Sequence, residues 1–234
     1  PHWADVVERV SAPPPDAGLP PGAQVMGIIN VTPDSFSDGG RHYDVWAALE
    51  SIQQMHAAGC RLIDIGGEST RPGAPPVWVE EEWRRIGPVI IAMRARSALD
   101  DMRISVDTRQ AMVMDRALAA GADIINDVSA LTYDPQARAV VARHGCPVVL
   151  MHMRGTPATM GRHTVYEDVA VDVTRELRQR VDEAVAAGIA RTRILVDPGI
   201  GFAKTFRAIW SFCRACRCWR TLAAGCCSGS HASG

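Results

Sequence analysis

The stretch Met26-Gly-Ile-Ile-Asn-Val-Thr-Pro-Asp-Ser-Phe-Ser-Asp-Gly-Gly40 is a short apolar run that passes directly into small and polar residues. A second stretch, Asp64-Ile-Gly-Gly-Glu-Ser-Thr-Arg-Pro-Gly73, has the same arrangement. Each predicts a buried β-strand followed by a loop of groups that suit an anionic ligand. Rigid strands that carry reactive loops at their carboxyl ends are typical of β/α enzymes.

The same rhythm continues along the chain, where short apolar runs alternate with longer stretches whose apolar residues recur at helical spacing. Gly59, Gly121, Gly145 and Gly188 each follow a helical stretch, where a left-handed residue is favoured. The predicted strands are 25–30, 62–66, 103–107, 124–127, 148–151 and 194–197, and the predicted helices are 45–58, 80–95, 110–119, 135–143 and 165–187. Strict alternation predicts a parallel sheet with helical crossovers.

Polar residues recur at the ends of five of the six predicted strands: Asn30, Asp64, Asp107, Asn126 with Asp127, and Asp197. Such repetition indicates the mouth of a barrel, because a doubly wound sheet concentrates its polar groups at one switch point. We therefore predict an α/β fold of the (β/α)8 TIM-barrel type, of which about six βα units are recognisable.

Composition limits the classes of function. The chain has 234 residues, of which 47% are apolar and 22% charged, as in a soluble globular protein. Its net charge of −1 indicates neither a nucleic-acid nor a membrane partner. No apolar run approaches the roughly 18 residues that span a bilayer. We expect a cytoplasmic enzyme of small molecules, with residues 1–24 as a Pro-rich segment or linker before the domain.

The first loop suits a metal and an anion. Asn30 can offer its amide oxygen to Mg²⁺ or its NH₂ group to a phosphate. The polar residues Thr32, Asp34, Ser35, Ser37 and Asp38 follow it. The alternative is an ordinary turn that caps the next helix.

The second loop also suits an anion. Arg71 supplies a planar fork of donors that matches phosphate oxygens, Thr70 adds a hydroxyl, and Gly66-Gly67 permit a close approach of the backbone. A lone loop arginine is otherwise a solvated surface charge.

A third group of polar residues comprises Asp107, Asn126 and Asp197. A carboxylate accepts two adjacent N–H donors side by side, and an asparagine meets the remaining donors and acceptors of a flat polar ring. The alternative for each acid is a cap on the following helix. Asp197 lies in Asp197-Pro-Gly-Ile-Gly-Phe202, a specific motif, whereas Ile125-Asn126-Asp127 alone is weak.

These motifs, from about residue 25 to residue 204, closely resemble those of the dihydropteroate synthase family of pterin-binding enzymes. The resemblance implies catalytic roles for Asn30 and Arg71. It implies pterin binding by Asp107, Asn126, Asp197, Met151 and Gly201. It implies diphosphate binding by Asn30, Thr70 and Arg71, with Mg²⁺ on Asn30, and a p-aminobenzoate pocket of Thr32, Phe36, Pro72 and Phe202. We interpret His152 as structural.

The resemblance also implies the reaction, in which the amine of p-aminobenzoate displaces diphosphate from 6-hydroxymethyl-7,8-dihydropterin diphosphate, giving 7,8-dihydropteroate for folate biosynthesis. A homodimer is expected for an intact member of the family. Two alternatives stay open: a pterin-binding methyltransferase domain of the methyltetrahydrofolate type, and a non-catalytic remnant. The Ser-Thr-Arg-Pro-Gly loop disfavours the methyltransferase, because a methyl donor has no diphosphate to hold.

Residues 207–234 differ sharply from the rest. They hold four Arg, no acidic residue and five of the seven cysteines, with no amphipathic period. A zinc site is one interpretation, although the spacing of Cys213, Cys216, Cys218, Cys226 and Cys227 matches no standard motif. A divergent native tail is a second interpretation, and a change of reading frame is the third.

The third interpretation has support on paper. A GC-rich back-translation of residues 207–234, read two bases further on, permits an amphipathic helix, an apolar strand and the Ser-Arg-Lys motif that the resemblance implies. We therefore expect an incomplete barrel domain at 25–206, an aberrant and frameshifted tail at 207–234, and impaired or absent activity for the chain as written, because open strand edges leave a barrel core unsealed.

Overall fold

The computed structural model describes residues 24–32, 40–69, 76–156 and 158–215. Within these residues, six strands form one parallel sheet in the order β1-β2-β3-β4-β5-β6, so that each strand pairs with its neighbour in sequence. The strands are β1 (Met26–Asn30), β2 (Leu62–Gly66), β3 (Arg103–Asp107), β4 (Ile124–Asp127), β5 (Val148–Met151) and β6 (Ile194–Asp197). This sequential order is that of a TIM barrel, whereas a doubly wound sheet reverses direction at a switch point.

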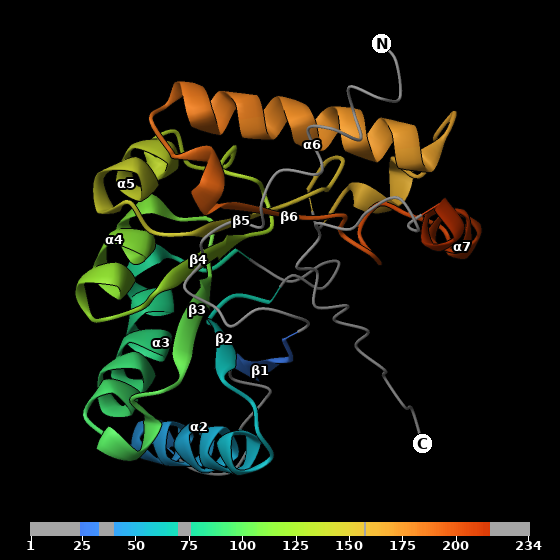
Figure 1. The fold of residues 1–234 in the computed structure, drawn as a ribbon. Helices are drawn as coiled ribbons and strands as arrows, with labels where there is room; N and C mark the ends of the chain where they lie inside the picture. The colour runs from blue at the N-terminus through green and yellow to red at the C-terminus, as the bar shows by residue number, and fades with distance from the viewer. Residues whose placement is uncertain (1–23, 33–39, 70–75, 157, 216–234) are drawn as a thin grey trace.

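Helices follow the strands around the outside of the curved sheet (Figure 1). They are α2 (Gly40–Ala57), α3 (Val79–Arg94), α4 (Ala111–Ala119), α5 (Ala137–His144), α6 (Val169–Ala186) and α7 (Phe206–Ala215). Short 3-10 turns lie at Ser97–Leu99, Met160–Arg162 and Arg191–Arg193. Among the described helices, none is both long and apolar enough to cross a membrane.

The hydrophobic core lies between the sheet and the helices. The strand residues that face the helices are aliphatic and buried: Ile29, Ile63, Ile65, Ile104, Val106, Ile125, Val148 and Leu150. Because successive side chains of a strand alternate between faces, the residues between them point to the opposite, inner face. That inner face carries the polar groups, as the site below shows.

The predicted strands agree with the structure, except that the first strand begins at Met26 rather than at residue 25. The four predicted glycine caps all have positive φ, between 61° and 105°. The predicted start of the helix at 165 is wrong, because Asp168 caps α6: its carboxylate accepts hydrogen bonds from the amides of Ala170 (2.9 Å) and Val171 (3.2 Å).

The expectation that residues 207–234 lack an amphipathic period is wrong over 207–215, where α7 continues. Phe212 of α7 is 1% exposed and belongs to a small apolar cluster with Val169, Val173 and Leu177 of α6. The opposite side of the helix is open, since Trp210 is 62% exposed. Residues 216–234, with the remaining cysteines of the zinc interpretation, lie outside the described residues.

Candidate active site at the carboxyl ends of the strands

Register brings the predicted site residues onto the inner face of the sheet. Asn30, Gly66, Asp107 and Asn126 are successive partners across β1 to β4. In-register partners of a parallel sheet point to the same side, so these positions form one row. Asn126 in turn pairs with Val149, and Val149 pairs with Leu195.

Two further predicted residues share the inner face. Met151 and Asp197 pair with each other, and each lies two positions beyond its strand's member of that row, which puts both on the same side. Met151 is 4% exposed, and Asp197 is partly buried. The carboxyl ends of β1, β3, β4, β5 and β6 therefore all contribute a predicted residue to one mouth.

Asp64 is a site residue that the sequence reasoning noted only as a strand end. It is 5% exposed and lies on the inner face of β2, two positions before Gly66 along the strand. Its carboxylate accepts hydrogen bonds from Ser105 Oγ (2.6 Å) and Asn126 Nδ2 (3.0 Å). Asp64 thereby fixes the orientation of the Asn126 carboxamide, with the amide oxygen left for a ligand. A lone acid within the apolar strand Leu62–Gly66 is the signal that could have identified it.

Burial and like charges dominate the electrostatics. The pKa of Asp107 is raised well above its ordinary value, first by burial and then by the negative charges of Asp64, Asp127, Glu82 and Glu68. A ligand that presents N–H donors to this group stabilises its ionised form. The part of the mouth around Asp107 is therefore suited to a donor-rich ring edge rather than to an anion.

Asp127 has a structural role beside the site. It is fully buried, and its carboxylate accepts hydrogen bonds from the Ser129 amide (2.7 Å), Ser129 Oγ (2.6 Å) and the Leu131 amide (3.0 Å). Burial raises the pKa of Asp127 to about 6 despite these hydrogen bonds. This residue shapes the loop after β4, and Asn126 faces the mouth.

The second loop is anchored at its base. Glu68 accepts hydrogen bonds from Arg109 Nε (2.8 Å) and Nη2 (2.7 Å) and from the Val77 amide (3.1 Å), while Arg85 Nη1 donates to the Gly67 carbonyl (2.8 Å). The Arg109 guanidinium also stacks over the Tyr133 ring, 4.0 Å from its centroid. Phe36, Thr70, Arg71 and Pro72 lie outside the described residues, so their predicted roles stay predictions.

The loop after β6 carries the last predicted residues. Asp197 accepts a hydrogen bond from the Gly199 amide (2.7 Å), and burial raises the pKa of Asp197. Gly201 has φ 94°, and the Phe202 amide donates to the Gly199 carbonyl (3.0 Å), which forms a tight turn. Phe202 is partly buried. Thr32, the other described residue of the predicted p-aminobenzoate pocket, lies two residues beyond β1 and is also partly buried.

Asn30 and Asp107 flank Gly66. A Cβ atom placed on Gly66 would lie 3.6 Å from Asp107 Oδ2 and 3.7 Å from Asn30 Oδ1, so both oxygens approach the space that the missing side chain leaves. Among the described residues, no group of three or more His, Cys, Asp or Glu side chains is placed to hold a metal ion. Asn30 is exposed at this point and offers a hard oxygen donor.

The fold and the site together define the class: a (β/α)-barrel chain with polar side chains gathered at the carboxyl ends of its strands, which is where enzymes of this fold bind their ligands. A family model described as pterin binding enzyme matches residues 26–218. The chain belongs to this pterin-binding enzyme family.

Curated relatives and solved structures agree with the family. The dihydropteroate synthase of Synechocystis sp. is 46% identical over 181 residues, which are 77% of this chain and 62% of that enzyme. The structure of Xanthomonas albilineans dihydropteroate synthase with 4-aminobenzoic acid has a TM-score of 0.75 and 46% identity, covering 86% of this chain and 71% of that one. The same enzyme in complex with 7,8-dihydropteroate has a TM-score of 0.74 and 42% identity, covering 88% and 73%. The chain spans less than two thirds of the length of the Synechocystis relative.

Proposed function

We propose that the chain is of the dihydropteroate synthase type, a transferase that joins 6-hydroxymethyl-7,8-dihydropterin diphosphate to p-aminobenzoate and releases 7,8-dihydropteroate and diphosphate, and that the chain as written has impaired or no turnover. One observation carries the proposal: the strand register gathers Asn30, Asp107, Asn126 and Asp197 on one inner face. The relatives reported above favour this reaction over a methyltransferase or a non-catalytic remnant.

The pterin is proposed to lie across β3 to β6. Asp107 and Asp197 accept the paired N–H donors of the ring, and Asn126, held by Asp64, meets a further donor. Met151 packs under the ring plane, and Gly201 lets the backbone approach it. The acidic surroundings of Asp107 fit a ring that develops positive charge as the methylene carbon reacts.

The diphosphate is proposed to bind Asn30, Thr70 and Arg71. Asn30 is exposed and its Oδ1 borders the space over Gly66, which fits a Mg²⁺ ion, since Mg²⁺ takes one or two protein oxygens beside phosphate oxygens and water. When bound, Mg²⁺ neutralises charge on the leaving diphosphate. Asn30 and Arg71 then orient the leaving group.

The p-aminobenzoate pocket is assigned to Thr32, Phe36, Pro72 and Phe202, which follow β1, β2 and β6 in the sequence. The amine nitrogen forms a bond with the methylene carbon while the bond from that carbon to the diphosphate oxygen breaks. The diphosphate leaves with the bonding electron pair, and the proton of the new ammonium passes to solvent. The chain's residues bind, orient and exclude water, and they form no covalent bond to the substrate.

We further propose that the chain comprises a Pro-rich segment at 1–24, a barrel unit at 25–206 and an out-of-frame tail at 207–234. Sequencing the encoding DNA across these codons decides it, since a second frame that runs on through Ser-Arg-Lys is required. A cytoplasmic location and a homodimer belong to the same proposal. Sedimentation of the purified chain tests whether it forms a homodimer.

The proposed function is tested by binding of 6-hydroxymethyl-7,8-dihydropterin diphosphate in the presence of Mg²⁺. We expect Asp107→Asn and Asp197→Asn to weaken binding by about tenfold or more, since each loses a charged acceptor. Asp182→Asn is the matched control, because this acid lies on α6 and pairs with Arg191 at the surface. Absence of binding by the parent chain, measured by thermal stabilisation, would overturn the proposal.

A further inference from the structure

Lys204 is the only lysine in the sequence, and it is buried, with 8% exposure. Its ammonium has three N–H donors and three acceptors around it: the carbonyl oxygens of Gly199 and Phe202 (both 3.0 Å) and Nδ1 of His152 (2.9 Å). Burial lowers the pKa of Lys204 to about 8, so it is mostly charged at neutral pH. Lys204 therefore ties the loop after β6 to the end of β5.

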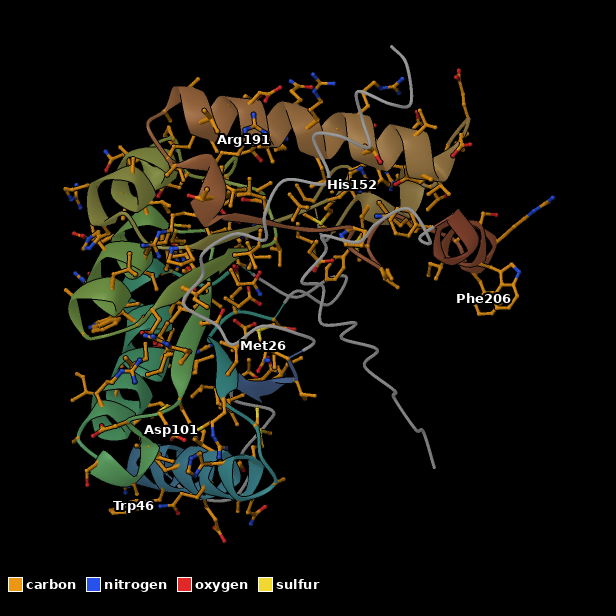
Figure 2. The ribbon with its side chains drawn as sticks, in the orientation of Figure 1. Met26, Trp46, Asp101, His152, Arg191 and Phe206 are labelled. Carbon is orange, nitrogen blue, oxygen red and sulfur yellow. The ribbon has the colours of Figure 1, made fainter. Side chains whose placement is uncertain are left out.

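His152 links Lys204 to α6 by hydrogen bonds at both of its ring nitrogens. Its Nδ1 faces the ammonium and must accept, so Nε2 carries the hydrogen and donates to Glu176 Oε2 (2.9 Å). Burial and the charge of Lys204 lower the pKa of His152 to about 4, which keeps the ring neutral and in this tautomer. His152 is 4% exposed and lies between the end of β5 and α6 (Figure 2).

Further contacts lead from Glu176 back to the loop that carries Lys204. Glu176 accepts hydrogen bonds from Arg154 Nε (3.1 Å) and Nη2 (2.5 Å), and the Arg154 guanidinium stacks over the Tyr166 ring, 4.0 Å from its centroid. Tyr166 Oη donates to the carbonyl of Ala203 (2.9 Å), the residue before Lys204. We call this set the closed ring: Lys204, His152, Glu176, Arg154 and Tyr166.

The loop that the ring holds has an unfavourable backbone conformation. Ala203 has φ 51°, a left-handed value that is uncommon outside glycine, beside Gly199 at 65° and Gly201 at 94°. Such a conformation persists only where the surroundings determine it. Two of the ring's contacts hold the backbone at this point. Tyr166 donates to the carbonyl oxygen of Ala203, and Lys204 donates to that of Phe202.

We propose that the closed ring is a positioning device for the pterin site, which fixes the loop after β6 so that Asp197, Gly201 and Phe202 face the mouth. The proposal rests on the proposed function for the identity of the ligand. Lys204 and His152 are positioning residues, which act on the ligand through the loop. The charged and titratable groups that face Lys204 are His152 from β5, Asp197 from β6, and Glu176 and Arg154 from α6 and its preceding loop.

The test compares Lys204→Met, which keeps an unbranched stem like that of lysine and removes the ammonium with its donors, with Lys204→Arg, which keeps the charge and donors. Arg178→Met is the control, because Arg178 is an exposed cation on α6 that pairs with Asp182 outside the ring. Hydrogen exchange of the peptide that spans 198–204 is measured in each variant. We expect Lys204→Met to speed this exchange by about tenfold or more, as for a lost hydrogen bond to a charged group, with partial rescue in Lys204→Arg.

Ligand binding separates positioning from a general loss of stability. In Lys204→Met we expect the affinity for the pterin diphosphate to fall by about tenfold or more, while the affinity for inorganic diphosphate with Mg²⁺, which the proposed function assigns to Asn30, Thr70 and Arg71, is unchanged. Equal losses for both probes would indicate a merely structural role and overturn the proposal.

A second variant guards against a failure of Lys204→Met to fold. Tyr166→Phe keeps the stacking on Arg154 and removes only the hydrogen bond to Ala203, so we expect a smaller acceleration of exchange in 198–204. Unchanged exchange in both Tyr166→Phe and Lys204→Met would overturn the inference. If exchange responds as expected but the parent chain binds no pterin diphosphate, the closed ring stands and the proposed function fails.

Discussion

Asp64 shows how a residue that touches no ligand can set the chemistry of one that does. Its carboxylate accepts from Ser105 Oγ and Asn126 Nδ2, so replacement by asparagine places an NH₂ group among donors. We predict that Asp64→Asn turns the Asn126 carboxamide and weakens pterin binding by about tenfold. Titration of the pterin diphosphate measures this. Ser105→Ala is the control, because it leaves the Asn126 contact in place; equal losses in both variants would contradict the argument.

Glu82 lies beside Gly67, at the base of the second loop, where burial makes its negative charge unfavourable. It is fully buried on α3; Oε2 accepts from the Gln110 side chain, and Oε1 has no hydrogen-bond partner among the described residues. Burial raises the pKa of Glu82 from 4.5 to about 7. Folding therefore favours the protonated acid, and stability is lost as pH rises from about 4.5 to 7.

We predict that Glu82→Gln stabilises the chain by on the order of 3 kcal/mol at pH 8, the equivalent of the pKa shift, and by little at pH 4.5. The neutral amide has the shape of the protonated acid, so the benefit should grow through the window from pH 4.5 to 7. Urea unfolding at several pH values measures it. A benefit that is independent of pH would show that packing, and not charge, is responsible.

The residues that sequence reasoning found and missed differ in one respect. Asn30, Asp107 and Asp197 end their strands, so local pattern sufficed to place them at the mouth. Lys204 and Glu82 act through contacts with residues distant in sequence, such as His152, 52 positions away, and Gln110, 28 positions away. No periodicity encodes such pairings.

At the scale of elements, the loop after β6 depends on two glycines in different ways. A Cβ atom on Gly199 would lie 2.1 Å from the backbone oxygen of His152, and φ is 65°. A Cβ atom on Gly201 would meet nothing within 4 Å, although φ is 94°. The first substitution requires a backbone shift, whereas the second adds only conformational strain.

We therefore predict that Gly199→Ala abolishes pterin binding, since the loop must leave His152. Gly201→Ala should fold with a loss of about 1–3 kcal/mol, the cost of one strained residue. Thermal unfolding and pterin titration of both variants provide the comparison. Retained binding in Gly199→Ala would mean that the loop is not held against β5.

The helix boundaries show where local pattern stops being sufficient. The helical spacing that begins at residue 165 continues into α6, but the helix itself starts only at Val169, because the Asp168 side chain satisfies the first free amides. Apolar spacing reports the face that packs, and the cap decides the start. An acid at Asp168 directly before the helix was a readable signal.

At the scale of the whole molecule, the outer face of the sheet forms the hydrophobic core and the inner face carries the polar groups of the site. Ile63 and Ile65 pack against the helices, while Asp64 between them faces the mouth. The parallel order was predictable because each strand–helix–strand unit is local. Within the described residues, β1 pairs only with β2 and β6 only with β5, and what meets these two edges depends on pairings that no local pattern encodes.

The extent of the folded unit is decided at α7. Phe212 is 1% exposed against Val173 and Leu177, whereas Phe206 at the start of the helix is 84% exposed and points away from the rest of the chain (Figure 2). If α7 is an integral part of the fold, Phe212→Ala should lose about 3–5 kcal/mol of unfolding free energy, the usual cost of emptying a buried phenylalanine site.

Trp210→Ala, on the same helix but 62% exposed, should change stability by about 0.5 kcal/mol or less. Urea unfolding of the parent chain and both variants measures the difference between the two losses of stability. This difference does not depend on which reading frame encodes the helix. Equal and small effects would place the end of the folded unit before α7 and make residues from 207 onward dispensable. A large effect of Phe212→Ala alone would place α7 inside it, because only a docked helix can lose the apolar contacts that α6 provides.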